Sequence, residues 1–292
     1  RAGEGGGGAA GAGRWCGVTV GAAGREGGLE ECPWIGGKLT GTRQWTDKLG
    51  ALQVEAPALT FVAGQFARLA LPAPPGSKEP MLGRPYSFVN PPERAPHEFY
   101  FNVLPEGPLS PRLAALESGA PLWLLERANG FFSMPEVPSA AVLWCLATGT
   151  GIGPFLSILR TADPWEKFER VVLVHAVRYA QDLSYRDVIA EIGTARAGRF
   201  AFAPFVSRQT DRSALAGRIP DAIRDGRPGA WTGLPRTAET APIPLSRDPA
   251  LVARTPGVHQ LPGVARTCAG ARRHTTRATC ATVVVGSVVN SN

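Results

Sequence analysis

A glycine-rich turn between two apolar segments constrains the fold of this chain more than any other feature. The segment Ala147–Pro154 separates the apolar run Ala141–Leu146 from the apolar-faced segment Pro154–Leu159, and a second apolar run, Val171–His175, follows. A strand, a turn, a helix and a strand in this order make a parallel βαβ unit. The pattern continues with the candidate helix Tyr185–Glu191, the candidate strand Phe200–Ser207 and the candidate helix Leu215–Asp225. We therefore predict a doubly wound parallel α/β domain over residues 138–240.

The preceding part of the chain has a different pattern, in which short apolar stretches are separated by Pro-Pro, Pro-Gly and Glu-Gly turns. The candidate strands are Lys38–Gln44, Leu49–Glu55, Gln65–Leu71, Tyr86–Val89, His97–Leu104 and Pro121–Leu125. Short strands at this close spacing indicate a small antiparallel β-barrel. One helix, Pro111–Glu117, is expected among them, because Ser110 suits its N-cap and proline suits its first position. We therefore predict a two-domain chain, with an antiparallel β-barrel over residues 34–137.

The two ends of the chain differ from its middle. Residues 1–33 hold 12 of the 35 glycines and show neither a strand nor a helix period, which indicates a disordered or non-native extension. Residues 241–292 contain no Phe, Tyr, Trp or Lys and no sustained amphipathic period, so we expect no closing strand or helix there. We hypothesise that this atypical tail, and the first 33 residues with it, arise from a shifted reading frame or a misplaced boundary.

The formal net charge of +7 is unevenly distributed. From residue 235 onward seven Arg stand against Glu239 and Asp248 and contribute +5 of that total, so the rest of the chain is close to balanced. The middle has no Lys/Arg block interleaved with aromatic residues, and we expect no nucleic-acid partner. No apolar stretch approaches the ~18–20 residues that span a bilayer, and we expect no membrane association.

The five cysteines are widely scattered, and no two of them have the spacing of a zinc or iron–sulfur site. We therefore expect no metal. Their odd number and the lack of a cationic-then-apolar leader favour a reducing, cytoplasmic setting.

Three groups of residues carry chemistry that suits dinucleotides. In Arg84-Pro85-Tyr86-Ser87 a guanidinium suits a diphosphate, a phenol can stack on a flat ring system and a hydroxyl can donate to a ring nitrogen. The alternative is an edge strand with a surface Arg and a half-buried Tyr. The second group, Gly107–Ser110, stands before the predicted helix, where backbone N–H groups and the helix dipole favour an anion. The alternative there is a plain turn with a capping Ser.

The third group comprises the glycine-rich turn and four residues that follow later strands. The glycines of Ala147–Pro154 allow the backbone to approach a pyrophosphate, and its Thr hydroxyls supply donors. Each of Arg178, the pair Ser207 and Arg208, and Arg218 is predicted just beyond a strand or, for Arg218, within the helix Leu215–Asp225. In a parallel sheet such residues converge at the carboxyl edge. Arginine in place of a ribose-binding carboxylate favours NADP over NAD. For any one of these arginines, a solvated surface residue is the alternative.

Taken in order and spacing, these motifs resemble bacterial ferredoxin–NADP+ reductase from about residue 34 to residue 240. The resemblance rests on Arg84–Ser87, Gly107–Leu113, Gly130-Phe131-Phe132, Ala147–Leu159, His175–Tyr185 and Val206–Pro220. It implies an FAD-dependent oxidoreductase that moves electrons between NADPH and an acidic carrier, ferredoxin or flavodoxin, as a cytoplasmic monomer. A reductase that serves an oxygenase or another acceptor remains open, and so does a flavin-binding protein with impaired catalysis.

The resemblance also implies roles for individual residues. Arg84 would bind the FAD phosphate beside Pro85, with Tyr86 and Ser87 as the catalytic residues against the isoalloxazine ring and near its N5 atom. The rest of FAD would be held by Tyr100, Phe101, Asn102 and Val103 and by Pro108, Leu109 and Ser110. Thr148 would lie between flavin and nicotinamide, next to Gly149 and Thr150. NADP would bind Val177, Arg178, Ser207, Arg208 and Arg218.

Two features stand apart from this set. His175 is expected to be a packed or hydrogen-bonded strand residue, because hydride transfer to flavin is the cofactor's own chemistry and needs no acid–base catalyst. The family closes with a Cys-Gly-Asn-Pro strand–turn and a terminal aromatic residue, whereas residues 245–249 here read Leu-Ser-Arg-Asp-Pro and nothing aromatic follows Trp231. This departure puts nicotinamide binding in question.

Overall fold

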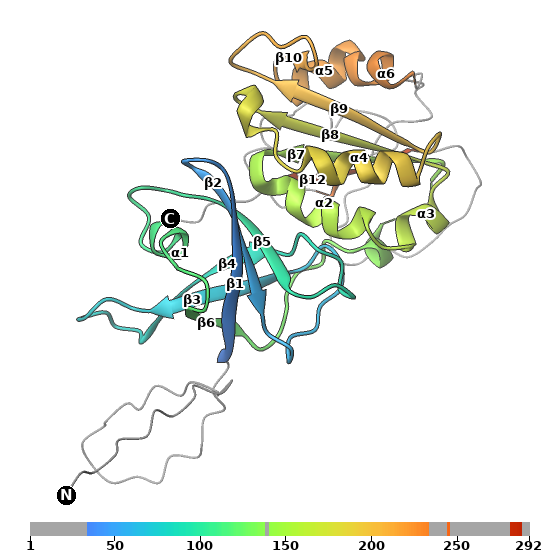
Figure 1. Ribbon diagram of the computed structural model, residues 1–292. Coiled ribbons are helices and arrows are strands. Elements are labelled where there is room, and N and C mark those ends of the chain that lie inside the picture. Colours follow the sequence, from blue (N-terminus) through green and yellow to red (C-terminus); the bar gives the residue numbers. More distant parts are fainter. Residues whose placement is uncertain (1–33, 138–139, 234–243, 246–280, 288–292) are drawn as a thin grey trace, which may run out of the picture.

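The computed structural model describes residues 34–137, 140–233, 244–245 and 281–287 (Figure 1). The first strand begins at Trp34, where structured sequence was expected to start. The predictions for residues 1–33 and for most of the tail lie outside the described residues.

The first domain is an antiparallel sheet of six strands in the order β4-β3-β6-β1-β2-β5. Its strands are β1 (Trp34–Thr46), β2 (Leu49–Glu55), β3 (Phe66–Pro72), β4 (Met81–Ser87), β5 (His97–Asn102) and β6 (Pro121–Leu125). The two edge strands meet just after β4, where Phe88 pairs with Phe99 and the Val89 N–H donates to the Glu98 carbonyl oxygen at 2.9 Å. This pairing closes the sheet on itself. The antiparallel first domain is as predicted.

Alternating side chains from these strands fill the interior of the barrel. Leu39, Leu69 and Leu122 are fully buried there, and the rings of Phe61 and Phe88 stack with their centroids 3.6 Å apart. The short helix α1 (Ser110–Ala114) adds Leu109 and Leu113 to the same core. The turn that precedes α1 is thereby anchored to the barrel.

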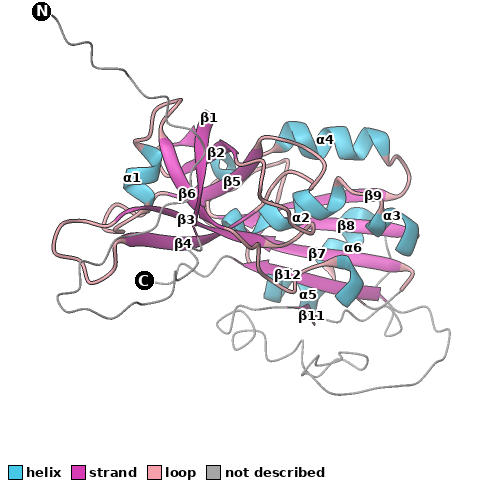
Figure 2. Cartoon of the chain, turned by 90° about the horizontal axis from the view of Figure 1, so that it is seen from below, coloured by secondary structure: helices cyan, strands magenta, loops and turns pink. Residues whose placement is uncertain are grey.

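The second domain is an all-parallel sheet in the order β10-β9-β8-β7-β12-β11. Figure 1 labels β10, and Figure 2 labels the other five strands. Its strands are β7 (Val142–Thr148), β8 (Arg170–Val177), β9 (Phe200–Val206), β10 (Leu215–Ala216), β11 (Pro244–Leu245) and β12 (Ala281–Ser287). The core on one face includes residues of α2 (Ile152–Leu159), α3 (Asp163–Lys167) and α4 (Arg186–Ala195), and the core on the other includes residues of α5 (Ile219–Asp225). Helices on both faces confirm the doubly wound prediction.

The tail contributes a strand that was not expected. Strand β12 pairs in parallel with β7 along its whole length, from Ala281 opposite Val142 to Ser287 opposite Thr148. The expectation that residues 241–292 hold no closing strand is therefore wrong. A strand inside a parallel sheet is covered on both faces, so its sequence is a continuous apolar run and not an alternation of apolar and polar residues. The run Thr-Val-Val-Val fits that pattern without any aromatic residue.

Three local predictions also need correction. Ser110 does not cap α1, because it is the first helical residue and its Oγ accepts the Leu104 N–H at 2.9 Å. The segment predicted as one helix from Leu215 divides at Gly217, whose φ of 96° ends β10 before α5 begins. Short helices missed by periodicity are η1 (Met134–Glu136), α3, η3 (Ala180–Asp182) and α6 (Arg227–Thr232). Within the described ranges, no helix combines the length and apolar character needed to cross a bilayer.

The two domains share one apolar core. Leu49, Val89 and Tyr100 of the barrel belong to the same buried cluster as Ile152 and Phe155 of α2. A hydrogen bond also crosses here, from Ser157 Oγ to the Asn90 carbonyl oxygen at 2.8 Å. The barrel and the α/β domain are therefore packed against each other at this seam.

Candidate cofactor sites

The Arg84–Ser87 segment forms the end of β4. The strand was predicted over Tyr86–Val89, but it begins earlier, at Met81, and ends at Ser87. It pairs with β3 over its whole length, with Ser87 opposite Phe66. Pro85 is tolerated because β4 is an edge strand at this point. All four residues are partly exposed, so a ligand could reach each of them.

The ring of Tyr86 is held edge-on against Phe101 of β5, with centroids 6.0 Å apart and planes at 81°. Burial raises the pKa of Tyr86 to about 12, and the nearby Arg84 guanidinium opposes that rise. The phenol is therefore neutral at physiological pH. It offers an apolar face and one O–H donor beside a permanent positive charge.

Arg68 is a residue that sequence reasoning missed. Its Nη2 donates to the Gly83 carbonyl oxygen at 3.2 Å, and Arg84 Nη1 donates to the same oxygen at 3.0 Å. The two guanidinium groups therefore lie side by side, and no ion pair recorded among the described residues includes either of them. A doubly charged anion suits such a pair. The pairing of β3 with β4 across the Ala73–Pro80 loop was the signal that could have located it.

The predicted FAD residues of β5 and the following turn divide into two sets. Tyr100 points away from Phe101, and its hydroxyl contacts Ser184 Oγ of the second domain at 2.6 Å, so its side chain belongs to the domain seam. Phe101, Leu109 and Ser110 are buried within the barrel domain. The predicted FAD residues that remain at least partly exposed are Asn102, Val103 and Pro108. The buried residues Phe101, Leu109 and Ser110 could bind a ligand only through their backbone N–H and C=O groups.

The glycine-rich turn follows β7 directly. Thr148 is the last residue of β7, and η2 (Gly149–Gly151) lies against strand β5 of the barrel. Gly149 has φ +51°, and a Cβ placed there would meet no atom within 4 Å, so open space lies over this backbone. A phosphate can approach such a turn closely. Thr148, Gly149 and Thr150 are each partly exposed, next to the flavin-binding candidates of the barrel.

His175 supports this turn from below. Its Nε2 lies 3.0 Å from the Gly149 carbonyl oxygen, and because a carbonyl only accepts, Nε2 carries the proton. The ring is fully buried, and that burial lowers its pKa to about 4. His175 is thus a neutral, hydrogen-bonded strand residue, as predicted, and not a general base.

The arginine-bearing segments lie together at the carboxyl edge of the parallel sheet. The Ser207 N–H donates to the Val177 carbonyl oxygen at 3.1 Å, and the Arg208 N–H donates to the Arg178 carbonyl oxygen at 2.9 Å. Arg218 lies two residues after β10, whose Ala216 pairs with Val206. It therefore precedes α5 and does not lie within a helix that begins at Leu215, as was predicted. Arg178, Ser207, Arg208 and Arg218 are all exposed, whereas Val177 is buried behind them.

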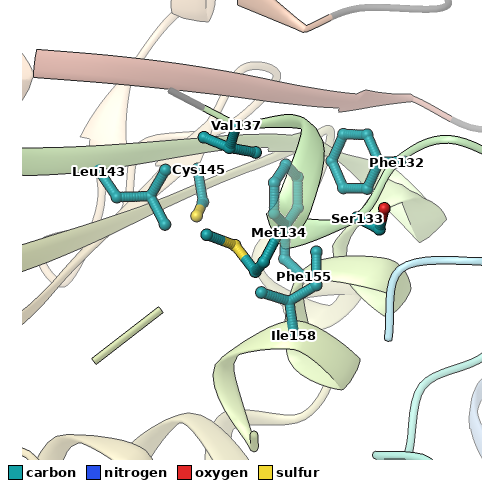
Figure 3. A pocket seen from close by; sticks show the side chains of 8 residues that line it. All are labelled: Phe132, Ser133, Met134, Val137, Leu143, Cys145, Phe155 and Ile158. Carbon is teal, nitrogen blue, oxygen red and sulfur yellow. The ribbon is translucent and has the colours of Figure 1, made fainter. Parts of the chain in front are cut away.

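A small cavity near the domain linker is not a cofactor site. Its volume of about 10 Å³ is far below the usual range for ligand pockets, and no charged side chain lines it (Figure 3). Its lining residues are Phe132, Ser133, Met134, Val137, Leu143, Cys145, Phe155 and Ile158. Burial raises the pKa of the Cys145 thiol, which therefore stays protonated and packs as a small apolar group.

Comparison with known proteins agrees with this arrangement. Residues 145–235 match the family described as the oxidoreductase NAD-binding domain. The chain is 44% identical over 222 residues to the flavodoxin/ferredoxin–NADP reductase of Escherichia coli, covering 76% of this chain and 88% of that protein. It is 30% identical over 206 residues to the ferredoxin–NADP reductase of Pseudomonas aeruginosa, covering 68% and 78%. A crystal structure of a Neisseria gonorrhoeae ferredoxin NADP+ reductase with bound FAD and NADP is similar with a TM-score of 0.72 and 26% identity, covering 87% of this chain and 99% of that one.

An antiparallel barrel with a cationic strand end, packed on a parallel α/β domain with a cationic edge, defines a two-domain flavin and nicotinamide oxidoreductase. The chain belongs to the flavodoxin/ferredoxin–NADP reductase family. The resemblance predicted from the motifs is confirmed.

Proposed function

We propose that this protein is an FAD-dependent oxidoreductase that transfers electrons between NADPH and ferredoxin or flavodoxin. One observation carries the proposal: the turn Gly149–Gly151 of the α/β domain lies against strand β5, whose Phe101 contacts Tyr86. A nicotinamide-binding turn and a flavin-binding strand are thereby adjacent. Family membership supports the same reaction.

The donor set in the barrel fits FAD. We assign the diphosphate to Arg84 with Arg68 as a second guanidinium, because both converge on one carbonyl oxygen and neither is recorded in an ion pair within the described part of the chain. Tyr86 is assigned to the face of the isoalloxazine ring and Ser87 to its reactive edge. The accessible residues Asn102, Val103 and Pro108 would complete the site, together with backbone of Tyr100–Ser110.

The donor set in the α/β domain fits NADPH. We assign the 2′-phosphate to Arg208 and Arg218, because both are exposed at one sheet edge and a guanidinium binds phosphate in a bidentate manner. Arg178 and Ser207 flank them, with Val177 behind. The open backbone at Gly149 would receive the pyrophosphate, and Thr148 and Thr150 would lie toward the nicotinamide.

When bound, FAD accepts a hydride from NADPH and passes electrons singly to a carrier protein. The protein's own contribution is placement. Tyr86 supplies a neutral aromatic wall, and Ser87 supplies a hydroxyl donor at the end of a rigid strand. His175 holds the Gly149 carbonyl oxygen, which fixes the backbone of the turn that would receive NADPH. No side chain is required to hold or move the transferred hydrogen.

We further assign residues 34–137 to the FAD domain and residues 138–240, extended by β12, to the NADP domain. Ferredoxin or flavodoxin is the proposed acidic carrier, as family membership suggests, and a cytoplasmic monomer is the proposed setting. These assignments rest on the family and on the motifs together.

The experiment is direct. The purified protein is expected to be yellow, with a flavin absorbance spectrum, and to reduce ferricyanide with NADPH much faster than with NADH. Reduction of ferredoxin or flavodoxin by NADPH completes the test. Protein that carries no flavin after reconstitution, or flavoprotein that NADPH does not reduce, would contradict the proposal.

A further inference from the structure

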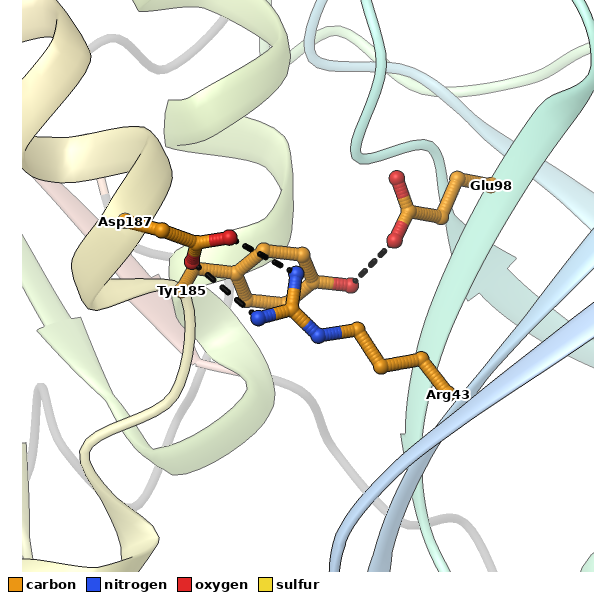
Figure 4. Close-up of polar contacts among 4 residues, drawn as sticks. All are labelled: Arg43, Glu98, Tyr185 and Asp187. Carbon is orange, nitrogen blue, oxygen red and sulfur yellow. Dashed lines mark hydrogen bonds and ion pairs between the residues drawn. The ribbon is translucent and has the colours of Figure 1, made fainter.

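The start of helix α4 is held by the barrel at three nearby residues. Figure 4 shows two of them, Tyr185 and Asp187, with their partners Glu98 and Arg43. Ser184 contacts the Tyr100 hydroxyl at 2.6 Å, the Tyr185 hydroxyl donates to Glu98 Oε1 at 2.9 Å, and Asp187 pairs with Arg43. We call these six residues, with Arg43, Glu98 and Tyr100 on the barrel and Ser184, Tyr185 and Asp187 on the α/β domain, the clasp.

The ion pair of the clasp is bidentate and oriented. The Arg43 guanidinium approaches both carboxylate oxygens of Asp187, with Nη1 and Nη2 each 3.1 Å from its partner oxygen. Its Cζ also lies 4.5 Å from the ring centroid of Trp45 and 5.6 Å from that of Tyr185. The two charged side chains remain 42% and 54% exposed, so the pair contributes little to stability but fixes an orientation.

Tyr185 is the strained member of the clasp. It has φ 59° and ψ 27°, the only positive φ of a non-glycine residue within the described ranges. Its buried ring packs against Trp45 and Tyr100, with centroids 4.5 Å and 5.2 Å away. A bulky residue holds this conformation only when its surroundings determine it, and such strain gathers where position matters for function.

The clasp lies on the same loop as a proposed NADPH ligand. Arg178 follows β8, and the chain then passes through η3, which lies against β1 of the barrel, to Ser184. Within this connection the Tyr179 N–H donates to Asp182 Oδ2 at 3.2 Å, so the connection is stiffened internally. Arg178 is therefore held between two fixed points: strand β8 precedes it, and η3, which lies against the barrel, follows it.

We propose that the clasp is a positioning element that sets the NADP-binding loop and the α/β domain in the register that hydride transfer requires. The proposal rests on the proposed function and deepens it. The apolar core that the domains share drives their association, but apolar contacts are not directional. The hydrogen bonds and the ion pair of the clasp are directional. Reacting atoms must approach to about 3–3.5 Å, and a displacement of about 1 Å can cost a hundredfold in rate.

Arg43→Gln and Asp187→Asn are the variants that test the clasp. Both side chains are largely exposed, so the proteins are expected to fold and retain flavin. Flavin reduction at saturating NADPH, followed by stopped-flow absorbance, is expected to slow about tenfold. Hydrogen exchange of the amides in residues 178–187 is expected to accelerate, and the dissociation constant for NADP+ to rise. The charge reversal Arg43→Asp with Asp187→Arg is expected to recover most of the rate.

Asp225→Asn is the matched control, because it breaks the Arg227–Asp225 ion pair, 3.4 Å long, within the α/β domain and away from the seam. It should leave flavin reduction unchanged. Wild-type reduction rates in Arg43→Gln, or an equal loss in Asp225→Asn, would overturn the inference. Failure of the wild-type protein to be reduced by NADPH would instead sink the proposed function, so the two failures are distinguishable.

Discussion

The barrel and the α/β domain present their candidate ligand residues in opposite ways. In the barrel, Arg84–Ser87 lie within a paired strand and are half-buried, with the ring of Tyr86 against Phe101. In the α/β domain, Arg178, Arg208 and Arg218 follow their strands and are exposed on a sheet edge. His175 is a titratable group buried behind that edge, and its Nε2 contacts the Gly149 carbonyl oxygen of the turn. A site built into strands suits a permanently held cofactor, and an exposed edge suits one that is exchanged in each turnover.

The largest expected effect concerns the buried histidines of the two domains. Burial lowers the pKa of His175 to about 4. Between about pH 6.5 and pH 4, the imidazole is therefore neutral in the folded protein, whereas in the unfolded chain, where its pKa is about 6.5, it binds a proton. Stability is therefore lost as the pH falls from about 6.5 to 4, by roughly 3 kcal/mol for this group. His97 in the barrel is shifted in the same direction by burial. Urea unfolding at several pH values measures the slope.

His175→Gln is expected to flatten this pH dependence more than His97→Gln does. The comparison uses the slope of unfolding free energy against pH. The stability that each variant loses through poorer packing does not depend on pH, so it does not affect this slope. A larger flattening in His97→Gln would reverse the assignment of the acid-sensitive group to the α/β domain.

The next largest effect is expected in the barrel. Arg84→Ala removes the charge-assisted contact that we propose to the FAD diphosphate. Such a contact is worth about 1.5–3 kcal/mol, so the variant is expected to bind FAD about 10- to 100-fold more weakly. The ratio of flavin to protein absorbance after gel filtration gives a first measure, and titration of the apoprotein with FAD gives the dissociation constant. Arg112→Ala, in the same domain, is the control for loss of an arginine. Unchanged FAD affinity in Arg84→Ala would show that the cofactor is held elsewhere.

A smaller effect is expected at the exposed edge. Arg208→Ala is expected to raise the KM for NADPH about tenfold and to leave the KM for NADH unchanged, because only NADPH carries the 2′-phosphate. Ferricyanide reduction with the two nucleotides measures both constants. FAD content should stay at the wild-type level. Equal losses with NADPH and NADH would argue that Arg208 acts on the fold of the edge and not on the phosphate.

The smallest effect is expected from Arg68→Gln, which should weaken FAD binding about threefold. Its guanidinium is exposed and shares its carbonyl acceptor with Arg84, so solvent screens part of its charge. The same FAD titration detects the change, and raising the salt concentration should diminish it. A loss as large as that of Arg84→Ala would mean that the two arginines contribute equally.

Local pattern predicted the elements well where period and turn residues agreed. Strands Leu49–Glu55 and Pro121–Leu125 have the predicted bounds, and the βαβ unit around Ala147–Pro154 is present. Prediction was less accurate where a strand begins in a proline-rich loop, as at Met81, or ends at a positive-φ glycine, as at Gly217. These boundaries depend on pairing partners and backbone conformation, which a single stretch of sequence does not display.

The same limit applied to the candidate sites. Motifs identified the residues that the structure gathers at the strand end and at the sheet edge, because spacing along a strand or after it follows from the chain alone. Ser110 was misread as a cap, since its hydroxyl finds a partner in Leu104 across the turn. Tyr100 is predicted to help hold FAD, and because its side chain contacts Ser184 of the second domain, that prediction now falls on its backbone groups.

By itself, then, the sequence determined the two fold classes, the order of the domains and the chemistry of the cofactor residues, because apolar period and motif spacing are local properties. Only the tertiary structure decided which groups meet. It placed Arg68 beside Arg84, drew Tyr185 into a left-handed conformation against Glu98, and paired Arg43 with Asp187, 144 residues away. Contacts of this kind follow from how two domains pack, and that packing depends on side chains remote from each other in the chain.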